Sequence, residues 1–398
     1  MGAVMTGGTL TRTERAAPEP YTWAMLDASI AALLQGLPAA DLAALSAPSP
    51  IGGRGEVREL WREHQRRGIP KELPSSLPFA VSGLSHGLAL VADLYATEGT
   101  PVVVPEPYWG NYRQAFAIRR GARIVLAPSY EDGRFDPEGI ARAVETLPRD
   151  RPAIAILNFP SNPGGTSPNE EERGRLLDAL IAAAAGALDR PLVVVCDDAY
   201  AGLVFEPEIP RGSLFWDLVA RRKEAPNLLP IKIDGATKEF SFFGGRIGFL
   251  TFPEEGVEEG AEVKFARYVR AGVGPPSAPS QAVLLQALRD PGIGDKIEAI
   301  RGVLEVRYRA LRDALAKVDP DLVRTFPFNS GCFALVEIPE ALGLTSDQVR
   351  RHLIEAESVG LISLEPRLLR IAHCSVAAEA IPELVTRLER GIAALAGR

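Results

Sequence analysis

Short apolar runs rich in β-branched residues alternate with longer amphipathic stretches between residues 79 and 252. Such runs are typical of the strands of a parallel sheet that is covered on both faces. The predicted strands are 79–81, 101–104, 122–127, 153–157, 192–196, 231–234 and 247–252. Stretches with helical periodicity, such as 170–185, lie between them. Strands joined by helices predict right-handed βαβ units, so the pattern indicates an α/β fold with a mainly parallel, doubly wound sheet.

The pattern changes after residue 290, where a long helix with arginines on its outer face is predicted over 295–318. The elements predicted beyond it form an α+β arrangement, with strands at 332–337 and 368–373 and helices at 346–357 and 381–395. Ahead of the sheet, helices are predicted at 21–34 and 56–67. We expect three parts: an N-terminal segment, 1–55, that packs on the small domain, a large domain, 56–295, and a small C-terminal domain, 296–398.

Composition restricts the classes of function. The chain has 398 residues and a formal net charge of −7, which argues against a nucleic-acid surface. The first residues lack the apolar core of a signal peptide, and no apolar run approaches the ~20 residues that span a bilayer. We therefore expect a cytoplasmic protein with no membrane or nucleic-acid partner. Cys196, Cys332 and Cys374 are expected to be reduced core thiols, and the histidines show no metal-ligand spacing, so no metal site is expected.

The loop between the last two predicted strands carries the residue type best suited to covalent chemistry. Lys238 lies among small residues after a buried strand, where its amine can be desolvated and kept neutral. Arg246 follows eight residues later and can offer several donors to a phosphate. Lys232 lies within the preceding apolar run and is expected to be a strand residue. The ordinary alternative for Lys238 is a solvated surface lysine.

Two further segments follow predicted strands at the carboxyl end, where doubly wound sheets place their ligands. Gly83, Leu84 and Ser85 lie between a strand and a helix start, and free backbone amides there can hold a phosphate. Trp109 lies in a loop with prolines and a glycine, and its ring can form a platform for a planar ligand. An ordinary turn and a packing role are the respective alternatives.

Two more strand ends carry polar side chains. Asn162, in the loop NFPSNPGG, can point its amide into the crevice. Asp197 follows the strongest apolar run, and its carboxylate needs a cationic or hydrogen-bonding partner because burial of a lone charge is costly. Tyr200 can present its hydroxyl to the same pocket. A simple turn and a helix N-cap are the alternatives for Asn162 and Asp197, and Asp198 is expected to be solvated or to act through another residue.

Taken together, these segments supply a phosphate cradle, a ring platform, an amide, a carboxylate with a phenol, and a lysine with an arginine. A phosphorylated aromatic aldehyde that contains a ring nitrogen and bonds to an amine needs all of these groups. Pyridoxal 5′-phosphate is such a molecule, and we expect it to be the cofactor.

The sequence resembles the aminotransferase class I/II family of fold-type I pyridoxal-phosphate enzymes over roughly residues 53–370. NFPSNPGG is similar to the family's N-x-x-N-P-T-G loop, CDDAY to its D-E-x-Y strand end, and TKEFSFFGGRIG to its S/T-K…R-x-G loop. PYWGNY is similar to the ring-stacking segment and LRIAHC to the C-terminal arginine strand. The resemblance implies a large domain with a seven-stranded type of sheet between helices and a smaller α+β C-terminal domain.

The resemblance also implies roles for the residues around the cofactor ring. Lys238 would form the internal aldimine and then move the substrate Cα proton as a base. Asp197 would pair with the pyridine nitrogen, and Asn162 and Tyr200 would hydrogen-bond the phenolic oxygen. Trp109 would stack on the ring.

Other implied roles concern the two anionic groups that the site must bind. The amides of Gly83, Leu84 and Ser85 and the guanidinium of Arg246 would hold the phosphate. Arg370 would bind the substrate α-carboxylate as a bidentate pair, with Asn162 beside it. Gly235 departs from the family pattern, which usually has a hydroxyl residue three positions before the lysine.

The implied activity is a ping-pong transfer of an amino group from an amino acid to a 2-oxo acid by a homodimer with active sites at the subunit interface. A carbon–sulfur β-lyase or another α,β-eliminating enzyme on the same fold is the main alternative. A cofactor-binding regulator is a weaker one, because such proteins generally carry a DNA-binding helix-turn-helix ahead of this domain. The sequence singles out no second cation for the side chain of a dicarboxylic substrate.

Overall fold

The large domain is built on a seven-stranded sheet. The computed structural model describes residues 10–11, 45, 48–131, 133–253 and 261–398. Within these residues the strand order is β2-β10-β9-β8-β7-β3-β4, and β10 runs antiparallel to both of its neighbours while the other pairs are parallel. The strands are β2 (Phe79–Val81), β3 (Pro101–Glu106), β4 (Arg123–Pro128), β7 (Ala153–Leu157), β8 (Leu192–Asp197), β9 (Leu228–Asp234) and β10 (Gly248–Thr251). A short hairpin, β5 (Tyr130–Glu131) and β6 (Arg134–Phe135), follows β4.

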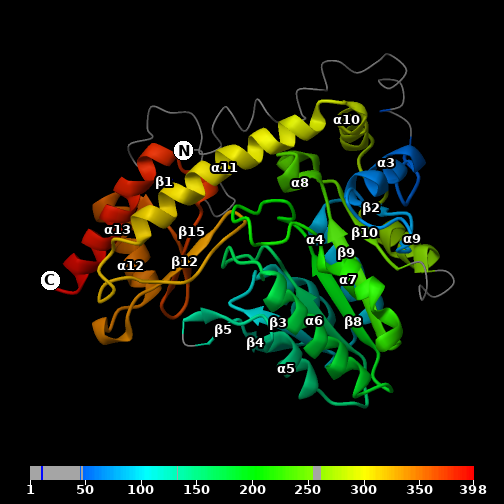
Figure 1. The fold of residues 1–398 in the computed structure, drawn as a ribbon, viewed down its shortest axis with the longest axis horizontal. Coiled ribbons are helices and arrows are strands. Elements are labelled where there is room, and N and C mark those ends of the chain that lie inside the picture. The colour runs from blue at the N-terminus through cyan, green and yellow to red at the C-terminus, as the bar shows by residue number, and fades with distance from the viewer. Residues whose placement is uncertain (1–9, 12–44, 46–47, 132, 254–260) are drawn as a thin grey trace.

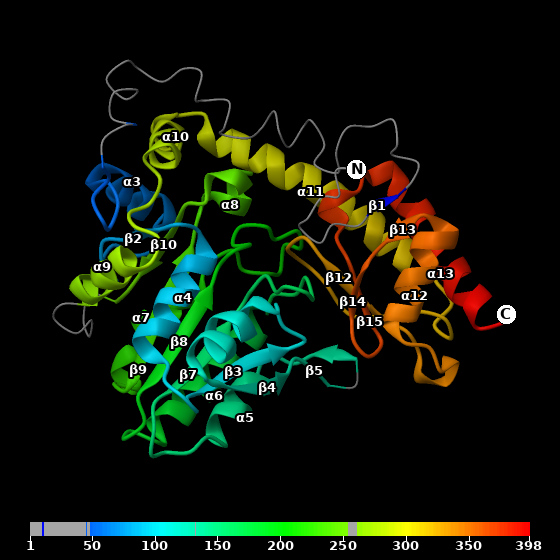
Figure 2. The ribbon, with the colours of Figure 1, turned by 180° about the vertical axis from the view of Figure 1, so that it is seen from behind.

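Helices cover both faces of this sheet. They are α3 (Gly55–Gln65), α4 (Leu84–Tyr95), α5 (Gly139–Glu145), α6 (Glu170–Ala185), α7 (Leu214–Ala220), α8 (Ala236–Glu239), α9 (Ala261–Ala271) and α10 (Ala278–Arg289). The residues of β7 alternate between two hydrophobic clusters: Ala155 and Leu157 pack with α5, α6 and α7, and Ile154 and Ile156 pack with α4 and α9. Figure 1 shows the first group of helices in front of the sheet, and Figure 2, from behind, shows α4 on the other face.

The small domain contains a four-stranded antiparallel sheet in the order β11-β12-β15-β14. Its strands are β11 (Arg324–Thr325), β12 (Ala334–Glu337), β14 (Ile362–Leu364) and β15 (Leu368–Ile371), and its helices are α12 (Ser346–His352) and α13 (Ile381–Leu395). Helix α11 (Ile293–Leu315) runs from the large domain to the small one (Figure 1). The predicted boundary at residues 295–296 falls within α11, and the division into three parts stays a prediction.

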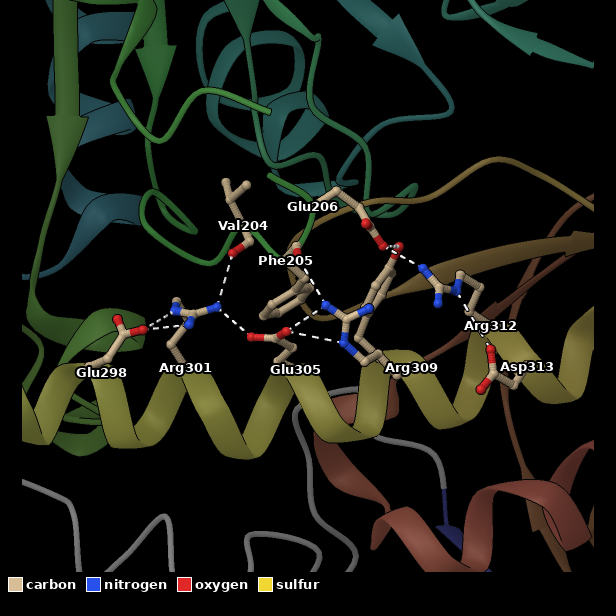
Figure 3. A network of polar contacts seen from close by, with 10 residues as sticks. Val204, Phe205, Glu206, Glu298, Arg301, Glu305, Arg309, Arg312 and Asp313 are labelled. Atoms are coloured by element: carbon tan, nitrogen blue, oxygen red, sulfur yellow. Dashed lines mark hydrogen bonds and ion pairs between the residues drawn. The ribbon is translucent and has the colours of Figure 1, made fainter. Parts of the chain in front are cut away.

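Polar contacts join α11 to the segment that follows Tyr200. Arg301 donates to the carbonyl oxygen of Val204 at 3.4 Å and pairs with Glu305 at 2.6 Å. Arg312 pairs with Glu206 at 2.6 Å (Figure 3). Arginines on this helix therefore face the large domain, whereas the sequence pattern predicted that they lie on the outer face.

The sequence predicted the fold class and the strands of the large sheet correctly, but it did not predict several elements, among them α7, α10, β11 and β14. Other differences lie at element ends. Strand β9 begins at Leu228, ahead of the predicted 231, and β15 ends at Ile371 because His373–Ser375 form a 3₁₀ turn. The helix expected over 346–357 continues beyond α12 as a π-helical segment, Leu353–Glu357.

The N-terminal predictions fall mostly on residues whose structure is not described. The helix predicted at 21–34 lies outside the described residues. The short strand β1 (Leu10–Thr11) pairs antiparallel with β13 (Val359–Gly360) of the small domain. Among the described helices, none has the length and apolar character required to cross a bilayer.

Candidate active site

One cavity of about 490 Å³ lies between the carboxyl ends of the large-domain strands and the small domain. Of the predicted site residues, nine line it: Leu84, Ser85, Trp109, Asn162, Asp197, Tyr200, Lys238, Arg246 and Arg370. The tenth, Gly83, lies against the guanidinium of Arg246. Most of these residues follow the carboxyl ends of parallel strands, which meet at one edge of the sheet. Arg246 instead precedes the antiparallel strand β10, and Arg370 lies on β15 of the small domain.

The start of α4 and Arg246 lie together at one end of the cavity. Gly83 has a φ of 84° and directly precedes α4, so the first amides of that helix and the positive end of its dipole face Arg246. A Cβ atom on Gly83 would lie 2.5 Å from Nη2 of Arg246. Arg246 has a φ of 48°, a conformation that non-glycine residues adopt rarely and often at functional sites. This arrangement fits a phosphate group.

Gly235 keeps the lysine loop close to this cradle. A Cβ atom there would lie 2.6 Å from the carbonyl oxygen of Ile247 and 2.7 Å from Cα of Gly248. Glycine, rather than the hydroxyl residue of the family pattern, thus stands where two backbone segments approach each other closely.

Replacing Gly83 with alanine is expected to weaken cofactor binding about ten- to a hundredfold. The added methyl group would displace Arg246 from the helix start, and alanine is strained at this positive φ, which costs about 1–3 kcal/mol. Titration of the cofactor-free protein, followed by absorbance, measures the dissociation constant. Ser85→Ala is the comparison, because it leaves the glycine and the helix start intact. Equal affinities in Gly83→Ala and the unmodified protein would show that the cradle is elsewhere.

Asp197 presents a buried carboxylate at the end of β8. The residue is 1% exposed, and its Oδ2 accepts a hydrogen bond from the Tyr112 hydroxyl at 2.7 Å while Oδ1 accepts one from the Ala199 amide at 3.2 Å. Burial raises the pKa of Asp197 to about 6, against these hydrogen bonds, which lower it. A cationic ring nitrogen in the cavity would stabilise the charged form of Asp197.

Lys232 is buried and Lys238 is partly exposed, and their surroundings shift their pKa values in opposite directions. Burial lowers the pKa of Lys238, and the positive charges of Arg370 and Arg246 lower it further. Lys232 pairs with Asp198 at 3.5 Å and more closely with Asp234. Burial alone would lower the pKa of Lys232, but these two carboxylates raise it. Lys238 is therefore the better nucleophile, because a neutral amine is the reactive form.

Of the two alternatives expected for Asp198, a solvated side chain is wrong, and the structure leaves the one in which it acts through another residue. It is 6% exposed, and its side chain faces Lys232 rather than the cavity. Lys232 lies in β9, as predicted.

The small domain contributes Arg370 to the cavity. Arg370 donates from Nη1 to Oδ1 of Asn162 at 2.8 Å, and its guanidinium carbon lies 4.3 Å from the centre of the Phe333 ring. Asn162 is positioned by Asn158, whose Oδ1 accepts a hydrogen bond from the backbone N–H of Asn162 at 2.8 Å. Arg370 is thus positioned to bind a carboxylate at the junction of the two domains.

Several residues that shape the site were not singled out in the sequence. Tyr112 supports Asp197 and also contacts the Trp109 ring edge to face, with centroids 5.7 Å apart. The centre of the Phe243 ring lies 4.7 Å from Nζ of Lys238. Tyr112 belongs to the PYWGNY segment that the resemblance already marked, but nothing in the sequence pairs it with Asp197.

The cysteines are free, and two of them lie closer to the site than the core placement implied. Cys196 and Cys332 are buried and Cys374 is partly buried. Cys332 and Cys374 lie close enough to Lys238 that their charged forms would raise its pKa.

A phosphate cradle, a buried carboxylate and an amine of lowered pKa in one cavity define a pyridoxal-phosphate enzyme on a fold-type I scaffold. Comparison with known proteins agrees: the chain belongs to the aminotransferase class I and II family, which it matches over residues 31–388. It is a pyridoxal 5′-phosphate-dependent aminotransferase.

Similar proteins include enzymes and solved structures of this family. A 2-aminoadipate transaminase of Thermus thermophilus is 28% identical over 325 residues, covering 79% of this chain and 75% of that protein. An aspartate aminotransferase of Bacillus subtilis is 23% identical over 353 residues, covering 86% and 82%. The crystal structure of LysN, an α-aminoadipate aminotransferase of Thermus thermophilus complexed with N-(5′-phosphopyridoxyl)-L-leucine, has a TM-score of 0.72 and 26% identity, covering 96% of this chain and 91% of that one.

Proposed function

We propose that the protein moves an amino group from an amino acid to a 2-oxo acid by a ping-pong mechanism in the cavity lined by Lys238, Asp197 and Arg370. The observation that supports this most is that a lysine with a lowered pKa shares one cavity with a buried carboxylate and with an arginine from the other domain. Pyridoxal 5′-phosphate, when bound, supplies an electron sink for the pair left behind when the donor loses its Cα proton.

Different residues would hold different groups of the cofactor. Arg246 and the amides at the start of α4 would bind the phosphate, and Asp197 would keep the ring nitrogen protonated. Asn162 and Tyr200 would hydrogen-bond the phenolic oxygen, and Trp109 would pack on the ring. Lys238 would hold the aldehyde carbon covalently through Nζ.

Two side chains, Arg370 and Lys238, would act on the substrate. Arg370 would bind the α-carboxylate of the donor, with Asn162 fixing the guanidinium from behind. Once the donor amine has displaced it, Lys238 would accept the Cα proton at Nζ and then donate that proton to the cofactor. Its lowered pKa favours the neutral amine that accepts the proton. We include a homodimer in the proposal, on the resemblance of the chain to its family.

The test follows the visible absorbance of the purified cofactor-bound protein as single amino acids are added without an oxo acid. A donor should bleach the absorbance once, in stoichiometric amount, and a 2-oxo acid should restore it. The variant Arg370→Gln should need much higher donor concentrations, because the α-carboxylate loses its bidentate partner. Continuous release of ammonia and an oxo acid from a β-substituted amino acid would instead identify an eliminating enzyme.

A further inference from the structure

The cavity wall beside Arg370 is apolar. Strand β14 lies at the edge of the small-domain sheet and pairs with β15 so that Ile362 is directly opposite Arg370 and Leu364 is opposite Leu368. Side chains alternate between the faces of a strand, so Ile362 and Leu364 share the face that carries Arg370. Both line the cavity.

Aromatic side chains also line the cavity. Phe333 lies against the guanidinium of Arg370, and Tyr108 and Trp109 line the cavity from the large domain. When Arg370 binds the α-carboxylate of a substrate, aliphatic and aromatic side chains of the protein therefore lie close to that carboxylate.

Under the proposed function, each lysine and arginine that lines the described part of the cavity already binds another group. Among the described residues that line it, the lysines and arginines are Lys238, Arg246 and Arg370. They are assigned to the aldehyde, the phosphate and the α-carboxylate respectively. A second carboxylate on the donor would lie against Ile362 and Leu364, and a carboxylate that loses water without gaining a partner is strongly disfavoured.

We propose that the preferred donor is a monocarboxylic amino acid with an apolar side chain, such as leucine, methionine or phenylalanine, and that Ile362 and Leu364 set this preference. The inference rests on the proposed function, since it takes Arg370 as the α-carboxylate site. Such a side chain leaves water on binding to this wall, which stabilises the complex in proportion to the apolar area covered.

Turnover with two donors tests the preference directly. We expect kcat/KM for leucine to exceed that for aspartate at least about tenfold, the size of discrimination that a small apolar pocket provides. Ile362→Arg should reduce this ratio about tenfold or more, by lowering the value for leucine and raising that for aspartate. Ile362 is partly exposed on an edge strand, so the variant should fold. Thr325→Arg adds the same charge on β11, at the opposite edge of the sheet, and should leave the ratio unchanged.

Binding without turnover separates this inference from the proposed function. Calorimetry with the cofactor-bound protein would compare 4-methylpentanoate with glutarate, which cannot react because they have no amino group. Tighter binding of 4-methylpentanoate, lost in Ile362→Arg but not in Thr325→Arg, is expected. If glutarate binds more tightly, or if aspartate is the better donor, the inference is overturned while the proposed function stands. If no amino acid bleaches the cofactor absorbance, the proposed function fails, and the calorimetry still decides the character of the wall.

Discussion

Replacing Lys238 with alanine is expected to lower kcat at least ~10³-fold. The change removes both the nucleophile that holds the cofactor and the base that moves the Cα proton, and positioned proton transfer alone contributes about 10²–10⁴-fold. Among the described residues that line the cavity, Lys238 is the one lysine, and its lowered pKa favours the neutral amine. Single-turnover bleaching of the cofactor absorbance by a donor measures the effect on the half-reaction.

Two comparisons show whether the loss comes from the missing amine. Lys238→Arg retains a positive charge but supplies no nucleophilic amine, so it should be as impaired as Lys238→Ala. Added methylamine should partly restore the half-reaction of Lys238→Ala, because a small amine can enter the vacated space and accept the proton. A Lys238→Ala variant that reacts as fast as the unmodified protein would rule out this lysine as the base.

Replacing Asp197 with asparagine is expected to lower kcat about 10²-fold or more and to stabilise the cofactor-free protein at neutral pH. The activity falls because an amide cannot keep the ring nitrogen protonated. The stability rises because folding raises the pKa of Asp197 from 3.8 to about 6, so the native state binds the proton more tightly than the unfolded chain. Stability from this group is present at low pH and is lost as the pH rises from about 4 to 6, by an amount of order 3 kcal/mol.

Urea unfolding of the cofactor-free protein between pH 4 and 7 measures this difference. In Asp197→Asn the decline in unfolding free energy over that range should be smaller. Asp198→Asn is the matched variant, because Asp198 is also buried with a pKa raised to about 6 but faces Lys232. It should alter the pH dependence of stability with a much smaller loss of activity. Equal activity losses in the two variants would contradict the assignment of Asp197 to the cofactor ring.

The sequence predicted the sheet because its signals are local. The β-branched run that ends at Cys196 is apolar enough to require cover on both faces, and the structure covers it so. Asn162, Asp197 and Lys238 could be predicted as neighbours because each follows a strand of the same sheet.

The remaining parts of the site depend on contacts between distant segments. Tyr112 bonds to Asp197 across 85 positions, and Asn162 meets Arg370 across 208. Ile362 enters the cavity only because its strand pairs with β15 in a particular register. Hydrophobic periodicity marks such residues as apolar or aromatic, but the register and the domain packing decide which of them face a ligand.

The central claim is that Lys238 is the lysine that bonds to the cofactor, and borohydride reduction followed by peptide mass spectrometry tests it most directly. Reduction converts the carbon–nitrogen double bond between an aldehyde and an amine into a stable single bond. Lys232 is the internal comparison, because it is more deeply buried than Lys238 but is held in its charged form by Asp198 and Asp234. We predict that the phosphopyridoxyl group is found on Lys238. Its recovery on Lys232, or on any other lysine, would contradict the account.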